Sequence, residues 1–242
     1  PLFVREGEEI HVSGDFPEGE NKEELTNGNR LFISLVGQLN GKISKAVIEW
    51  FRSFNVISGL EQGAYLHSSL EMIMEKGKEF DMAISLYKRL NLGFNTIYAD
   101  KKDQKERASL FPELRFSDLV SNDYTLKTTH HKYDEQGNIV GKVEFDKKEQ
   151  ESAGSNKVID LSGPLFSTLL NGSLLVVDEL DAKLHPLLTR ELVLLFNNPE
   201  TNPQNAQLIF ATHDTNLLST DIFRRDQIWF TEKDNMEQTD LY

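Results

Sequence analysis

The sequence lacks cysteine, long apolar runs and basic clusters, and each absence excludes a class of protein. Without cysteine among its 242 residues the chain has no disulfides and no thiolate metal sites, which fits a reducing cytosol, and we expect a cytoplasmic protein. No apolar run approaches the ~20 residues of a membrane-spanning helix, so we expect no membrane partner. The formal net charge of −13, with no Lys or Arg run beyond a pair, repels phosphate backbones and does not support nucleic acid as a partner.

A phosphate-binding loop of the form G-x-x-x-x-G-K-[ST] is also missing. The nearest string, from Gly37 to Ser44, has too few residues between its glycines and has Ile43 where Ser or Thr should stand. It falls within a predicted helix, so we interpret it as a chance match. Position 1 is Pro rather than Met, and we expect either an internal fragment of a longer protein or a truncated gene product.

Two long stretches have the apolar spacing of helices. Apolar residues recur at three- and four-residue steps from Leu31 to Phe54, which predicts one amphipathic helix with Trp50 on its buried face. A second helical region is predicted from Ser68 to about Leu90. Trp229 also falls on an apolar pattern, so we expect both tryptophans to belong to the core.

The middle of the chain carries a strand pattern. The stretches Thr125–Tyr133 and Ile139–Phe145 alternate around a turn-forming cluster, which predicts a β-hairpin. Its histidines, His130 and His131, have no metal-ligand companions and are assigned no function. The charged stretch 99–109 is typical of a solvated loop.

After residue 150 the pattern changes to that of a parallel sheet. The segments 173–178 and 207–212 are short, continuously apolar runs with a helical pattern between them, which predicts a βαβ unit in a buried sheet. In such sheets chemistry gathers beyond the carboxyl ends of the strands. Asp178, Glu179 and His213 stand at those ends, so we expect them at one edge of the sheet.

These three side chains suit the chemistry of a nucleotide phosphate. Asp178 offers a hard oxygen ligand for Mg²⁺, which keeps most of its waters when it is bound to nucleotide. Glu179 points elsewhere and can orient and deprotonate an attacking water, and His213 can donate a hydrogen bond to a γ-phosphate. Upstream, the small turn 151–155 opens a helix and can present amides to an anion, although in isolation its sequence favours a plain helix cap.

The order of these segments resembles that of ABC-type ATPase heads, the group that includes SMC and RecF proteins. The matching elements are the signature motif, the Walker B motif, the D-loop and the switch histidine. The sequence around these motifs resembles that of one branch of this group, the AAA family ATP-binding proteins of abortive-infection and phage-defence systems. The strings that carry this likeness are Val-Asp-Glu-Leu-Asp-Ala-Lys-Leu-His-Pro at 177–186, Gln-Leu-Ile-Phe-Ala-Thr-His-Asp-Thr at 207–215 and Arg-Arg-Asp-Gln-Ile-Trp-Phe at 224–230.

The resemblance implies roles for individual residues and ATP with Mg²⁺ as cofactors. Asp178 would support Mg²⁺, Glu179 would be the general base, and His213 would contact the γ-phosphate. The likeness extends less sharply through Gln38-Leu-Asn40 and 47–58 and therefore covers nearly the whole chain.

The same resemblance implies that the site is completed by a second copy. Ser152, Gly154 and Ser155 would bind ATP held by the opposite subunit, and Asp181 would belong to the loop that couples the two sites. Glu-Ser-Ala-Gly-Ser replaces the Leu-Ser-Gly-Gly-Gln of transporters, which argues against a transporter. We therefore expect a homodimer or higher homo-oligomer formed through ATP-sandwiched heads.

The expected fold is α/β, half of an ABC-ATPase-head-like P-loop NTPase with parallel core strands and a helical and β-hairpin lobe. Residues 1–150 would form that lobe, with the N-terminal Walker A part absent. Residues 151–242 would form the signature, Walker B and switch-histidine part of the nucleotide-binding domain.

The expected function is an ATP-binding and ATP-hydrolysing subunit whose nucleotide-driven dimerisation controls an anti-phage effector, a nuclease or toxin. The chain alone is expected to be inactive, because it lacks the Walker A loop. One alternative is a DNA-repair ATPase of the RecF and SMC kind, which long coiled-coil arms would favour. Others are a non-catalytic scaffold fragment and, more distantly, a metal-dependent nuclease built on Asp178 and Asp181.

Overall fold

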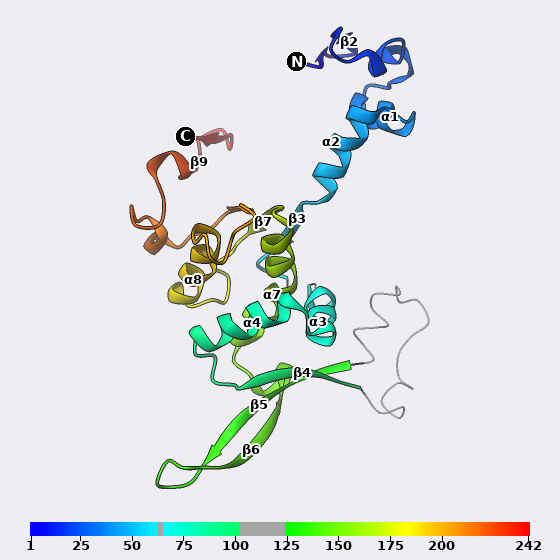
Figure 1. Cartoon of the computed structure of the whole chain (residues 1–242). Coiled ribbons are helices and arrows are strands. Elements are labelled where there is room, and N and C mark those ends of the chain that lie inside the picture. The colour runs from blue at the N-terminus through cyan, green and yellow to red at the C-terminus, as the bar shows by residue number, and fades with distance from the viewer. Residues whose placement is uncertain (62–64, 102–123) are drawn as a thin grey trace. The chain divides into compact units, whose positions relative to one another are not determined.

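The computed structural model describes residues 1–61, 65–101 and 124–242 (Figure 1). It consists of two compact units, Pro1–Phe54 and Asn55–Tyr242. This division differs from the expected boundary at residue 150. The strand that begins at Asn55 pairs within the same sheet as the predicted strand 173–178, so residues on both sides of 150 share one unit.

The first unit is a small β-hairpin followed by two helices. Strands β1 (Phe3–Glu6) and β2 (Glu9–Val12) pair antiparallel, and the 3-10 turns η1 (Pro17–Gly19) and η2 (Glu23–Leu25) lead to α1 (Phe32–Gln38) and α2 (Lys42–Arg52). Its core consists of four buried apolar side chains, Ile10, Phe16, Phe32 and Val36.

The prediction of a single helix over residues 31–54 is wrong, because the helix is interrupted between α1 and α2. Asn40 adopts a left-handed conformation with φ of 71°, which no α-helix continues through. The carboxylate of Glu18 then accepts the amides of Ile43 and Ser44, at 3.0 and 2.7 Å, and caps the second helix. The string that superficially resembles a phosphate loop is therefore a helix start already occupied by a carboxylate of its own unit.

The expectation that both tryptophans belong to the core is also wrong. Trp50 is 58% exposed and Trp229 is 64% exposed. On α2, Trp50 instead stacks edge-on with Phe54 at a centroid distance of 4.5 Å. Periodicity identified an apolar face of this helix but not whether its own unit covers that face.

The second unit contains the predicted parallel sheet. Strands β3 (Asn55–Ser58), β7 (Leu174–Asp178) and β8 (Gln207–Phe210) lie in the order β3-β7-β8, and both pairings are parallel. The predicted adjacency of 173–178 and 207–212 is confirmed. Helices α7 (Ala153–Asn171) and α8 (Pro186–Asn197) contribute Leu161, Leu165, Leu192 and Phe196 to the apolar layer against one face of this sheet.

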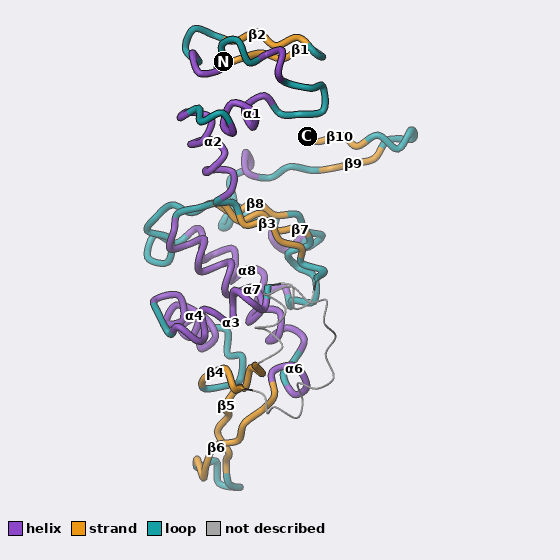
Figure 2. Tube along the Cα trace, turned by 90° about the vertical axis from the view of Figure 1, so that its right-hand side faces the viewer, coloured by secondary structure: helices purple, strands orange, loops and turns teal. Residues whose placement is uncertain are grey.

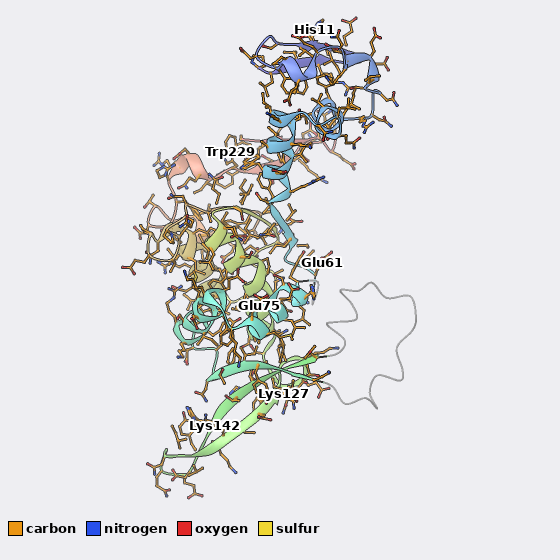
Figure 3. The ribbon with its side chains drawn as sticks, turned by 45° about the vertical axis from the view of Figure 1, so that its right-hand side comes forward. His11, Glu61, Glu75, Lys127, Lys142 and Trp229 are labelled. Atoms are coloured by element: carbon orange, nitrogen blue, oxygen red, sulfur yellow. The ribbon has the colours of Figure 1, made fainter. Side chains whose placement is uncertain are left out.

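A second three-stranded sheet contains the predicted hairpin. Strand β5 (Tyr124–Tyr133) pairs antiparallel with β4 (Thr96–Lys101) and with β6 (Ile139–Asp146), which confirms the hairpin. Figure 3 shows Lys127 near the base of this hairpin and Lys142 closer to its tip. Of the expected solvated loop 99–109, residues 99–101 belong to β4 and the others lie outside the described residues.

Helices connect the two sheets of this unit. Figure 2 shows α7 between them, with β3, β7 and β8 on one side and β4, β5 and β6 on the other. The helical region expected over 68–90 is two helices, α3 (Leu66–Glu75) and α4 (Lys78–Arg89), because Lys76 adopts a left-handed φ of 52°. The remaining elements are α6 (Lys147–Gln150), the 3-10 turns η4 (Thr215–Leu217) and η5 (Arg225–Gln227), and the strands β9 (Thr231–Lys233) and β10 (Thr239–Leu241).

The fold is thus mixed α/β with a parallel sheet, as the sequence predicts at the level of fold class. Within the described residues, every helix is too short or too polar to cross a membrane.

Candidate functional site

The candidate site lies where β7 and β8 end. Because the two strands are parallel, the residues that follow them meet at one edge of the sheet. His213 Nε2 lies 3.3 Å from Glu179 Oε1, so the predicted juxtaposition of these two side chains is present. The His213 side chain is 82% exposed and that of Glu179 is 30% exposed. Both groups can therefore reach a ligand from solvent.

Backbone geometry sets the direction of Glu179. Its φ is 55°, a left-handed conformation that is unfavourable for a residue with a side chain. The next amide, that of Leu180, donates to the Ala211 carbonyl at 3.0 Å and ties this turn to the end of β8. The turn is therefore held from one side by the neighbouring strand.

Gly59 holds the same turn from the other side. Its amide donates to the Asp178 carbonyl at 2.6 Å, immediately after β3 ends. A Cβ built on Gly59 would lie 1.7 Å from the carbonyl oxygen of Glu179, so only glycine permits this approach. Sequence reasoning missed this residue, although a glycine directly after an apolar strand is a signal for close backbone approach.

Asp181 ties the loop after β7 to the loop after β8. Its Oδ1 accepts the Thr212 hydroxyl at 2.6 Å and the His213 amide at 3.3 Å. Partial burial alone would raise the pKa of Asp181, but the hydrogen bonds from Thr212 and His213 outweigh it and hold that pKa below its usual range. Asp181 therefore positions His213 through the backbone of the same chain.

The predicted signature turn is a helix cap in this structure. Ser152 Oγ accepts the Ser155 amide at 3.0 Å and lies 2.9 Å from the Ser155 hydroxyl, which makes Ser152 the N-cap of α7. Ser155 is buried and both of its polar groups bond to Ser152, so it is the least accessible of the three predicted ligand-binding residues. A Cβ on Gly154 would lie 3.8 Å from the Lys183 carbonyl, which places this turn beside the loop that follows β7.

Asp178 is exposed at the end of β7 and is available to a cation. Among residues 1–61, 65–101 and 124–242, no three His, Asp or Glu side chains gather as a ready metal site. One carboxylate at a strand tip fits Mg²⁺, which keeps several waters and shares its ligands with nucleotide phosphates. It does not fit an ion that needs a complete protein cage.

Two polar contacts near this turn were not predicted. Glu151, with a side chain only 6% exposed, lies 2.8 Å from His130 Nε2 and accepts the Thr128 hydroxyl, so β5 anchors the residue just before Ser152. Lys157, on α7, donates to the Gly59 carbonyl. Both contacts join residues far apart in the chain, and local patterns carry no signal of such pairs.

One comparison with known proteins assigns the chain to a family. A family model described as an AAA domain and associated with the AbiEii toxin of type IV toxin–antitoxin (TA) systems matches residues 2–219, which is most of the chain. None of the curated proteins matches the chain.

Proposed function

The chain belongs to this AAA-domain family, and from that membership we propose that it supplies the carboxylate and histidine side of an ABC-type ATP-hydrolysing site. The observation that carries the proposal is the 3.3 Å approach of His213 to Glu179 at the carboxyl edge of two parallel strands. Fold alone does not specify chemistry, and this pair is the part of the fold suited to phosphoryl transfer.

The proposed reaction is hydrolysis of ATP to ADP and phosphate. Glu179 accepts a proton from a water whose oxygen attacks the γ-phosphorus, and the bond from that phosphorus to the bridging oxygen of ADP breaks. His213 donates a hydrogen bond to the γ-phosphate oxygens as charge shifts during the displacement. Asp178 would hold Mg²⁺ through water or directly, and the ion would supply positive charge against the phosphates.

A phosphate loop is needed to complete this site, and the described sheet has room for the strand that would precede it. In the order β3-β7-β8, β8 is an edge strand. Val56 on β3 and Ile209 on β8 both lie in register with Val176 on β7, so they share one face of the sheet. They are 69% and 57% exposed, whereas Ile57, on the other face, is buried. Both β3 and β8 are edges of the sheet, and parallel sheets are normally covered on both faces, which supports a further strand at one edge and a helix over this exposed face.

The proposal includes a second copy and an effector. The Ser152 turn would bind the γ-phosphate of ATP held by a second copy, and nucleotide would then join two identical faces in a two-fold dimer. This dimer would control a partner protein, a nuclease or toxin, in an anti-phage response. The description of the family names the AbiEii toxin of type IV TA systems, which supports the toxin–antitoxin setting of the proposal.

Replacing Glu179 tests the proposed chemistry in the protein that joins this chain to its phosphate loop. Glu179→Gln keeps the size of the side chain and removes the base, so ATP turnover should fall by about 100-fold or more while Mg-ATP affinity is retained. Glu200→Gln, at an exposed position beyond α8, is the matched control and should leave both unchanged. Turnover that survives in the Glu179 variant would remove this residue from the proposed role.

A further inference from the structure

Lys157 is a buried lysine with an unusual partner. It lies one turn into α7, is 4% exposed, and donates its ammonium group to the carbonyl of Gly59. The nearby Asp160 carboxylate is already paired with Lys147 at 2.5 Å. Burial lowers the pKa of Lys157, and the charge of Asp160 opposes that shift only in part. A buried ammonium group held mainly by a neutral carbonyl is unfavourable, so its retention calls for a reason.

The bond from Lys157 acts on Gly59, the residue that contacts the turn at Glu179. The Gly59 amide donates to the Asp178 carbonyl at 2.6 Å, and the Gly59 Cα faces the Glu179 carbonyl so closely that no Cβ fits. Glu179 itself has a φ of 55°. Such a conformation persists only where surrounding contacts over-determine it. Lys157 holds the Gly59 carbonyl, and the Leu180 amide ties the other end of the turn to the Ala211 carbonyl.

We infer that Lys157 is a positioning residue for Glu179, which it acts on through Gly59 from the helix that carries the Ser152 turn. The inference deepens the proposed function, since the role of Glu179 as a base rests on that proposal. The contact makes the first turns of α7 and the Asp178–Glu179 backbone one rigid arrangement. A ligand at the Ser152 turn would thereby act on the orientation of the carboxylate in the same chain.

Amide hydrogen exchange in the 242-residue chain tests the contact without nucleotide. Lys157→Met keeps the length of the side chain and removes the donor. Exchange at the Gly59 and Leu180 amides, relative to that at Leu175 inside β7, should then rise about tenfold, the size expected for one charge-assisted hydrogen bond. Lys148→Met, at an exposed position in α6, is the control, because it removes a lysine near the start of α7 without disturbing the charges beside Lys157. Its exchange ratio should stay at the wild-type value.

A second variant keeps the test decisive if the methionine variant does not fold. Lys157→Arg retains a donor, so its exchange ratio should stay within about twofold of wild type. An unchanged ratio in Lys157→Met, or a raised ratio in Lys157→Arg, would overturn the inference.

Activity separates this inference from the proposed function. In the protein that carries the phosphate loop, Lys157→Met should lower kcat for ATP and leave KM unchanged, because the contact orients the base and does not touch ATP. A raised exchange ratio with unaltered kcat would uphold the positioning contact and contradict the proposed role of Glu179 instead.

Discussion

Asp181 makes the stability of the loops at the sheet edge depend on pH. The Thr212 hydroxyl and the His213 amide stabilise its charged form, so its pKa is lower in the folded than in the unfolded chain. A carboxyl with a depressed pKa stabilises the fold above its unfolded pKa, and that contribution is lost as the pH falls through the folded pKa. The relevant window therefore lies at and below about pH 4, the ordinary value for Asp.

Thr212→Val removes one of these hydrogen bonds and should raise the pKa of Asp181 towards its ordinary value. The variant should therefore be less stable than wild type at about pH 7, and the difference should be smaller at about pH 3, because protonation progressively removes the contribution of the charge as the pH falls below the ordinary pKa of Asp. Urea unfolding at the two pH values measures this, with Thr231→Val in the exposed strand β9 as control. An equal loss of stability at both pH values would show that the hydroxyl acts through packing and not through the charge.

At the scale of single residues, the sequence predicts which site residues stand together at strand ends. It does not predict contacts between residues that are far apart in the chain. Asp178, Glu179 and His213 could be placed together because each follows an apolar run and parallel strands end at one edge. Gly59 and Lys157 could not be paired, because their contact joins β3 to a helix far along the chain. Only the folded chain brings them together.

Among the elements, helix ends that interrupt a continuous apolar pattern were the least predictable. The apolar spacing of α1 continues into α2 with only Leu39, Asn40 and Gly41 between them, and left-handed Asn40 ends the first helix. Lys76 does the same between α3 and α4, although lysine is an ordinary helix former. Apolar periodicity shows which faces of a helix are apolar, but it does not reveal a single residue that adopts a left-handed conformation and ends the helix. The start of α7 was predictable, because Ser152 caps it locally.

The cap at Ser152 makes a testable contribution to stability. Ser152→Ala leaves the Ser155 amide without its side-chain acceptor and should destabilise the chain by about 1 kcal/mol. Ser85→Ala, at an exposed position inside α4, is the matched control and should change the unfolding free energy by less than about 0.5 kcal/mol. Chemical denaturation compares the two. If they are equally stable, the contact between Ser152 and Ser155 does not cap α7.

For the whole molecule, patterns in the sequence located apolar faces without showing what covers them. Ile209 is exposed on a strand predicted to be buried on both faces, and Trp50 is exposed on a helix face predicted to be core. Burial depends on neighbours that a local pattern does not contain. The proposed phosphate-loop segment would cover the open face of the sheet.

The chain by itself should bind ATP poorly. The amides and lysine that would hold the β- and γ-phosphates belong to a loop that its sequence does not contain. Calorimetry with Mg-ATP and the 242-residue chain should therefore show weak or no binding, and no hydrolysis should be measurable. Binding with a micromolar dissociation constant would mean that the residues of this chain alone form the nucleotide site.

Mixing two inactive variants of the protein that includes the phosphate loop tests the central claim most directly. Glu179→Gln removes the proposed base, and Ser152→Arg blocks the turn proposed to reach the ATP of the other copy. Each variant alone should lack ATP turnover. A mixed pair restores one complete site, so an equal mixture should recover about a quarter of wild-type turnover if copies exchange freely. No recovery from a mixture shown by light scattering to form mixed dimers would contradict the account, as would full turnover in either variant alone.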